Sequence, residues 1–485
     1  MRCLLLIVGV AVLSGCPPQT IEKLPPPGQF YFPTGVVHVD TPNLADGGAS
    51  DGILYVASAN FDKRFDFGTV IAVDLSKVGL PTFGAPVGFN DAGFGGPLQL
   101  TDLKLGPSAT VLIAPFAGEM AALPMPDAGA VRLYLPTRSE QHRLYGLDAP
   151  IPRTPGSAPS IGCFTPPGAS GPTTSEDGGT VDCSPTGLSL VAFEKSESGI
   201  PRAPAPIGVA ISATREVWVT ALQQADTPKG STLGTRAYVV HVNGDIPQVV
   251  ADTPLPDGGA IRGSFINVGA GATNTVVVGS RYAYATGRIY ASGVPANLLR
   301  AIDTTSFNAF NTFLENTFTV FEGRGAALSS AEDRLYLIGR SPDSLLVASI
   351  TNKDGPIPNI RVERSVPLPE APSLITTIPR PGKSDLVVVT CSTAGVVVFY
   401  DDEVGNLTAQ IAGVGLQPYA LAVDVRTTGG ARVYVTNFTD GRVAVIDVPD
   451  LSRPASAKIV AFLGSSQLCI TRGVNKTRGC DGGVR

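Results

Sequence analysis

The stretch RVYVTNFTDGRVAVID, Arg432–Asp447, contains two short apolar runs on either side of a polar turn. Its β-branched and aromatic residues favour strands, and Thr439-Asp440-Gly441 has the composition of a tight turn. The segment QPYALAVD, Gln417–Asp424, precedes it and adds another apolar strand that begins at a proline. Together these residues predict three consecutive strands of an antiparallel sheet.

The same order of strand, turn, strand, turn, strand recurs along the chain. Its copies begin near residues 33, 107, 206, 271, 323, 371 and 417. The last four copies follow one another at about fifty residues, which is typical of propellers. One more apolar strand, such as Leu407–Gly413, lies between copies. Four strands in each of seven copies predict an all-β, seven-bladed β-propeller with four-stranded antiparallel blades.

The last copy also resembles a known family. Tyr434-Val435-Thr436-Asn437, with Pro418 ahead and Ala444-Val445-Ile446-Asp447 behind, is similar to the YVTN family of β-propeller repeats. The resemblance extends over residues 32–464 and is most specific in this one copy. It implies a propeller in a bacterial or archaeal surface or periplasmic protein. It further implies a binding or structural module in which the motif residues build strands.

Two parts of the predicted propeller depart from the repeat. The segment from Gly146 to Pro204 is rich in Pro, Gly, Ser and Thr, and we expect a long functional insertion there. The ring must also be closed. We expect Ser456–Gly464 to form the outer strand of the last blade, because the proline-rich N-terminal segment is a poor strand.

The N-terminus, MRCLLLIVGVAVLSGC, has one early positive charge and a short apolar core. This is typical of a signal peptide, here residues 1–15. Leu13-Ser14-Gly15-Cys16 resembles a bacterial lipobox, which implies that Cys16 carries a lipid that binds the membrane. Residues 16–31 would then be a tether. Pro17 stands where an inner-membrane lipoprotein often has a retaining Asp, so we expect the outer membrane. The alternative is an ordinary secretory signal with a chance cysteine.

The other cysteines agree with an exported protein. We expect Cys163–Cys183 and Cys469–Cys480 to be disulfides, the second in a C-terminal tail of residues 465–485. Cys391 lies in an apolar run and is expected in the core. There is no CxxC motif, and the chain has three histidines, so no metal site is predicted.

Charge and hydropathy exclude further classes. The net charge is -5, charged residues make up 16%, and no basic stripe is present, so we expect no nucleic-acid partner. The longest apolar run, Leu386–Tyr400, is interrupted by Cys391–Gly395 and predicts two buried strands with a turn.

Motifs for catalysis are weak. Gly48–Gly52 matches G-x-S-x-G, but without the strand before it and the helix after it that a nucleophile needs. His38, His142 and His241 stand alone. Asp401-Asp402-Glu403 is expected to face water. The DGG and DAG triplets are typical of turns, and the alternative is that their carboxylates bind calcium. They begin at Asp46, Asp91, Asp127, Asp177 and Asp257.

These observations predict a lipid-anchored binding or scaffold module of the cell envelope rather than an enzyme, with no cofactor. Its partner is expected to be a protein or another envelope component. Binding of polysaccharide ranks lower, because it needs exposed aromatic side chains on one face and the chain is 7% aromatic. The alternative function is a calcium-dependent, lactonase-like propeller hydrolase with its site at the mouth of the channel.

Overall fold

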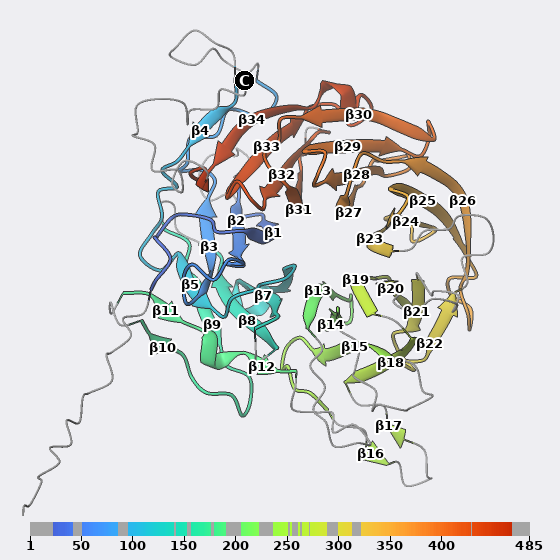
Figure 1. Ribbon diagram of the computed structural model, residues 1–485, viewed down its shortest axis with the longest axis horizontal. Coiled ribbons are helices and arrows are strands. Elements are labelled where there is room, and N and C mark those ends of the chain that lie inside the picture. The colour runs from blue at the N-terminus through green and yellow to red at the C-terminus, as the bar shows by residue number, and fades with distance from the viewer. Residues whose placement is uncertain are drawn as a thin grey trace, which may run out of the picture.

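The computed structural model describes residues 23–41, 51–85, 96–139, 142–152, 157–175, 179–190, 205–222, 236–250, 253–254, 260–261, 264–270, 272–288, 299–312, 322–427 and 429–467. Strands dominate these residues and form seven four-stranded antiparallel blades in a ring (Figure 1). The predicted all-β propeller is therefore confirmed. Apart from Gln467, at the end of the described ranges, helix within them is limited to the 3-10 turns η1 (Pro126–Ala128), η2 (Ser184–Thr186) and η3 (Pro454–Ser456). None of these helices is long and apolar enough to cross a membrane.

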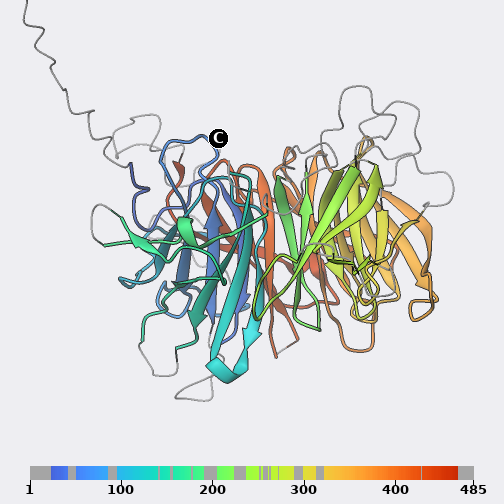
Figure 2. The ribbon, with the colours of Figure 1, turned by 90° about the horizontal axis from the view of Figure 1, so that it is seen from below.

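In each blade the strands follow one another from the ring axis to the rim (Figure 1). Figure 2 shows the same ring from its side. Blade 1 contains β1 (Pro33–Val39), β2 (Ile53–Ser58), β3 (Gly68–Asp74) and β5 (Thr110–Ile113). Blade 2 contains β6 (Ala121–Met125), β7 (Ala130–Thr137), β8 (Arg143–Pro150) and the short β9 (Gly162–Phe164) and β12 (Leu188–Ser189). Blade 3 contains β13 (Pro206–Ile211), β14 (Glu216–Ala221), β15 (Arg236–Asn243) and β18 (Phe265–Ala270). A separate ribbon is formed by β16 (Thr253–Pro254) and β17 (Ala260–Ile261).

Blade 4 contains β19 (Ala272–Val278), β20 (Tyr282–Arg288), β21 (Leu299–Asp303) and β22 (Ala309–Thr312), and blade 5 contains β23 (Glu322–Leu328), β24 (Arg334–Arg340), β25 (Ser344–Thr351) and β26 (Asn359–Pro367). Blade 6 contains β27 (Pro372–Ile378), β28 (Leu386–Cys391), β29 (Val396–Asp401) and β30 (Asn406–Ala412). Blade 7 contains β31 (Pro418–Val425), β32 (Ala431–Asn437), β33 (Arg442–Val448) and β34 (Lys458–Leu463). The apolar run Leu386–Tyr400 thus forms two buried strands, β28 and β29, as predicted.

The core of the described part consists of seven apolar layers, each between two neighbouring blades. Second strands contribute one large aromatic side chain at the same position in six blades, and all six are buried: Tyr55, Tyr134, Trp218, Tyr284, Tyr336 and Tyr434. Blade faces are therefore apolar on both sides, which explains why the repeat shows continuous apolar runs instead of alternation.

Inner strands carry a recurrent bulge close to their start. In four blades the strand begins at a proline preceded by a residue with positive φ, namely Phe32, Ala205, Ala371 and Gln417. One or two residues later the pairing with the second strand shifts by one residue. A bulge removes one backbone N–H from the ladder, so this group needs another acceptor.

A threonine on the second strand supplies this acceptor. The hydroxyl of Thr390 accepts the N–H of Leu374 at 3.1 Å and donates to the carbonyl of Tyr419, in the next blade, at 2.8 Å. Thr220 binds Gly208 N–H and the carbonyl of Asn274 in the same way. Thr286 and Thr436 likewise accept a bulge N–H. The Thr of the YVTN-like stretch thus has a structural role, as predicted.

Among the described residues, ring closure involves the C-terminal strand of the last blade. The outer strand of blade 7 is β34, which confirms the expectation for Ser456–Gly464. The described tether residues form no strand before Pro33, although Phe30 is buried between blades 1 and 7. An additional strand, β4 (Leu98–Leu100), comes from the connection between β3 and β5 and pairs parallel with β34. Blade 1 is thereby bonded to blade 7.

Two predicted boundaries were wrong. The apolar run after Pro107 does not open the second blade: its strand β5 is the outer strand of blade 1, and the inner strand of blade 2 begins at Ala121. The long insertion does not begin at Gly146, which lies in β8. Both errors have one cause. A buried outer strand and a buried inner strand have the same apolar composition, so spacing alone does not separate them.

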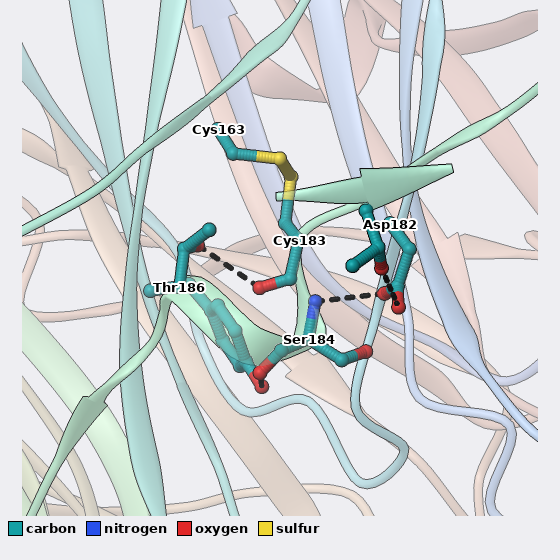
Figure 3. The surroundings of a disulfide bond; sticks show 7 residues. Cys163, Asp182, Cys183, Ser184 and Thr186 are labelled. Atoms are coloured by element: carbon teal, nitrogen blue, oxygen red, sulfur yellow. Dashed lines mark hydrogen bonds between the residues drawn. A yellow bond between two sulfur atoms is a disulfide. The ribbon is translucent and has the colours of Figure 1, made fainter. Parts of the chain in front are cut away.

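The insertion completes the rims of blades 1 and 2. Its strands β9 and β12 pair with β8, whereas β11 (Val181–Asp182) pairs parallel with β5 and carries β10 (Thr173–Thr174) at its edge. Cys163 lies in β9, and Cys183 follows β11 and donates its N–H to the carbonyl of Leu112 in blade 1. The predicted disulfide Cys163–Cys183 is present (Figure 3). It therefore links the outer edges of two blades.

We predict that the hydroxyl of Thr390 stabilises the fold. Thr390→Val would leave the half-buried N–H of Leu374 without this acceptor and lower the free energy of unfolding by about 1 kcal/mol. Thr390→Ser keeps the hydroxyl and loses one methyl group, which costs about 0.8 kcal/mol. Urea denaturation of the two variants measures the difference. Undiminished stability of Thr390→Val would show that the hydroxyl contributes nothing.

Candidate functional site

The inner strands enclose a cavity of about 280 Å³ on the ring axis. All seven blades contribute to its wall, which contains Thr34, Gly35, Val36, Glu119, Met120, Val209, Ala210, Thr275, Val276, Val277, Ala326, Leu374, Ile375, Thr376, Ala420 and Leu421. Most of these side chains are aliphatic, three are threonines, and Glu119 is the single acid among them. The volume suits a small ligand, because pockets for drug-sized molecules begin at about 300 Å³.

Glu119 reaches the channel because the inner strand of blade 2 is interrupted. Ala117 forms an isolated bridge with Thr137, and β6 begins only at Ala121. Between them the chain moves toward blade 3, where Glu119 N–H donates to the carbonyl of Ile207 at 2.8 Å. A Cβ atom on Gly118 would lie 2.2 Å from that carbonyl oxygen, so only glycine fits there. Glu119 therefore occupies the bulge of its blade.

The carboxyl group of Glu119 has an unusual environment. It accepts a hydrogen bond from the hydroxyl of Thr275 at 3.2 Å, and the charge of Arg324 acts on it from blade 5. Burial outweighs both effects and raises its pKa from 4.5 to about 7. Near neutral pH this group exchanges between an acceptor and a donor form. It can bind an ammonium group when ionised and a carbonyl or hydroxyl oxygen when protonated.

One mouth of this channel carries a cluster of aromatic rings. We call the side of the ring on which the inner strands begin the start face, and the opposite side the end face. The aromatic patch comprises Phe32, Phe61, Phe116, Tyr419 and Phe438. Ring centroids of Phe61 lie 5.5 Å from Phe116 and 5.7 Å from Phe438, and Phe61 is 47% exposed. These residues lie next to the wall residues Thr34, Glu119 and Ala420 in the chain, so the patch borders the channel.

A second polar cluster lies on the end face, between blades 1 and 7. His38, Asp40 and Asp424 bring three possible metal ligands together. However, Arg426 Nη2 lies 2.6 Å from Asp424 Oδ2 and 2.9 Å from Asp51 Oδ1. An arginine in direct contact with the carboxylate occupies the position and the charge that a cation would take. The residues do not fit a metal ion, and the cluster is best explained as an ionic contact between two blades.

Buried arginines strengthen the same contact. Arg432 is fully buried and bonds Asp447 at 2.7 Å, and its second branch reaches Asp51 at 3.3 Å. A buried guanidinium is tolerated only when acceptors surround it. The sequence contains the signal for such pairs, since Arg132 and Arg334 also stand two residues before the buried aromatic of their strand. They bind Asp148 and Glu363, respectively.

The predicted acidic cluster was wrong for two of its three members. Asp401 is buried and bonded to Arg380 at 2.7 Å, and Asp402 is buried and accepts from Tyr400 at 2.9 Å. Only Glu403 stays in water, where the Ser384 N–H and hydroxyl hold its pKa below the usual range. Arginines from neighbouring strands bury this turn, which a reading of one hairpin does not reveal.

Of the three histidines that were expected to stand alone, His38 does not, because it lies with Asp40 and Asp424 in the end-face cluster. His38 lies on the inner strand β1 and stacks on Tyr434. His142 follows a turn, and burial lowers the pKa of His142. His241 lies on β15, stacked on Phe307 at 3.9 Å. Cys391 is buried, as expected, and burial raises the pKa of its thiol to about 12.

Several candidate residues fall outside the described ranges. They are Cys16, Cys469, Cys480, Gly48–Ser50, and the triplets beginning at Asp46, Asp91 and Asp257. Of the turn triplets, Asp127–Gly129 is described in full. It forms η1 and its C-cap, with Gly129 at φ 58°, which supports the turn interpretation at that position.

Sequence reasoning missed Glu119 and the aromatic patch. Glu119 belongs to the copy of the repeat that was placed on the wrong strand. The patch residues come from loops of blades 1 and 7, the two ends of the chain. A signal for them was present: Phe32, Tyr419 and Phe438 flank strand starts and turns of the most regular copies.

Comparison with known proteins supplies no family. No protein-family profile and no curated protein matches the chain. Similar solved structures include a protein of unknown function from Desulfotomaculum acetoxidans (10% identity, 82% of this chain and 93% of the other, TM-score 0.45). Others are a protein provisionally assigned as a 6-phosphogluconolactonase from Bacteroides uniformis (13%, 67% and 80%, 0.41) and a chain of a nidogen/laminin complex (12%, 54% and 81%, 0.34). We infer no activity from these similarities.

We predict that Glu119 makes stability depend on pH. Its pKa is about 7 in the folded chain and 4.5 as the reference value, so between these pH values the folded state holds more protons. Stability therefore falls as pH rises through this window, by up to about 3 kcal/mol.

Glu119→Gln should remove this contribution, whereas Glu370→Gln, at an exposed position, should leave it. Urea denaturation between pH 5 and pH 8 measures the effect. If Glu119→Gln and the wild type lose stability in parallel, the carboxyl is not the titrating group.

Proposed function

We propose that the protein is a lipid-anchored binding module of the bacterial cell envelope, with the channel as its ligand site. The observation that supports this function is the cavity itself, in which one carboxyl group with a pKa near 7 meets threonine hydroxyls and aliphatic walls. Such a site binds and orients a ligand through a few polar contacts. The ligand class that fits is a small envelope molecule with an ammonium group.

The anchor is argued from the sequence. Leu13-Ser14-Gly15-Cys16 follows a signal-like apolar core, and the resemblance of the repeat to YVTN propellers points to the same compartment. The disulfide between blades 1 and 2 is consistent with an oxidising compartment. We propose the outer membrane as the site of the anchor, with no nucleic-acid partner.

The hydrolase alternative has less support. Calcium takes six to eight oxygen ligands, whereas the described channel wall offers one carboxylate and three hydroxyl groups. Glu119 also has no second acid beside it among those wall residues. A binding site accounts for the geometry of the channel wall without further metal ligands or catalytic residues.

Acylation gives the first test. In cells fed an alkyne-tagged palmitate, the wild-type chain should take up label, and Cys16→Ala should lose it. Cys3→Ala is the matched control, because Cys3 lies in the predicted signal peptide and should leave labelling intact. An unlabelled wild-type chain would refute the anchor.

Ligand binding gives the second test. Putrescine, free amino acids and monosaccharides serve as probes, and the change in Tm measures binding. Ammonium-bearing probes should raise Tm more at pH 8 than at pH 6, since Glu119 is ionised above its pKa of about 7. Glu119→Gln should abolish the response and Glu370→Gln should retain it. An equal response in Glu119→Gln would contradict the assignment of this site.

A further inference from the structure

We propose that the aromatic patch rests on the lipid interface, so that the start face and its channel mouth are turned toward the membrane. This inference rests on the proposed acylation of Cys16. It adds an interaction surface and an orientation that anchoring alone does not give. The occupant of the patch is the lipid surface itself.

The described end of the tether is fixed on the start face. Lys23 N–H donates to Asp66 Oδ2 at 2.6 Å, and Asp66 N–H donates back to the carbonyl of Lys23 at 3.0 Å. The ring of Tyr31 contacts Phe65 at 4.6 Å. Asp66 and Phe65 belong to the connection between β2 and β3, which also carries Phe61 of the patch. The chain toward Cys16 therefore departs beside the patch.

The remaining tether is short. Cys16 precedes Lys23 by seven residues, which span about 25 Å when fully extended. An inner strand of seven residues such as β1 is itself about 23 Å long, so the ring is about as thick as the tether is long. A tether that leaves from the start face would need its whole length to cross the thickness of the ring and reach the end face. The start face is thus the one that a lipid on Cys16 brings to the membrane.

The surface of this face suits the interface. Phe61 is 47% exposed, and Leu416, which lies three residues before Tyr419 of the patch, is 48% exposed. Lys63 Nζ lies 5.3 Å from the ring centroid of Phe116, and Lys23 Nζ lies 5.6 Å from that of Phe65. Aromatic and aliphatic side chains beside lysines are the combination that binds at the boundary between headgroups and acyl chains.

The strand β31 offers a matched pair of positions for a test. Leu416 precedes it on the start face, and Val425 ends it on the end face, with 48% and 50% exposure. Trp218 is the only tryptophan in the chain and is fully buried, so its emission is a constant background. Leu416→Trp and Val425→Trp can therefore be compared in the acylated full-length protein, bound to phosphatidylethanolamine/phosphatidylglycerol vesicles that contain brominated lipid.

We expect the emission of Leu416→Trp to shift to the blue and to be quenched by the brominated lipid, and Val425→Trp to behave as the wild type. Quenching of both, of Val425→Trp alone, or of neither would overturn the orientation. A blue shift of Leu416→Trp with peptidoglycan fragments but not with vesicles would overturn it in favour of a glycan. The intact mass of the protein measures acylation independently of fluorescence. A mass without the lipid would refute the anchor, and the quenching of the two tryptophan variants would still show which face contacts the membrane.

Discussion

One constraint governs the ring: the inner strands of six blades bulge near their start, and the N–H that each bulge releases needs an acceptor. Threonine on the second strand meets this need in four blades, and in two of them the same hydroxyl also reaches the next blade. In these two blades one threonine hydroxyl thus accepts the N–H within its own blade and donates to a carbonyl of the next blade. Where the threonine is replaced, as at Ala57 and Ile338, the inner strand presents glycine opposite, Gly35 and Gly325.

The bulge also explains why a repeat fold has a specific site. Repeated strands pack against repeated strands, and their residues are committed to the core. Bulge residues such as Thr275 and Leu374 line the channel, so a substitution there changes its wall. Blade 2 departs most from the pattern and places Glu119 on the axis. The polar seam between blades 1 and 7 has a different role, since its arginines and aspartates neutralise one another.

How much the sequence revealed follows from this division. The all-β fold, the blade number, the Cys163–Cys183 disulfide and the buried Cys391 depend on local composition and spacing, and these were predicted correctly. The start of blade 2 and the burial of Asp401 and Asp402 were not, because each depends on partners outside the local hairpin. Asp401 pairs with Arg380, from another turn of its own blade, and Asp402 with Arg364 of blade 5. The channel wall takes a few residues from each of seven blades. No short stretch of sequence contains it, so its residues are found only once the ring is assembled.

Blade 1 is bonded to both neighbours by segments that lie outside its own hairpins. Its partner on one side, β34, is the last strand of the described chain, and on the other side the disulfide needs Cys183 from the insertion that follows β8. Synthesis proceeds from the N-terminus, so the first blade to be made waits for the final strand before β4 has its partner. A chain cut short before residue 458 would therefore leave β4, in the connection between β3 and β5, without the strand that it pairs with.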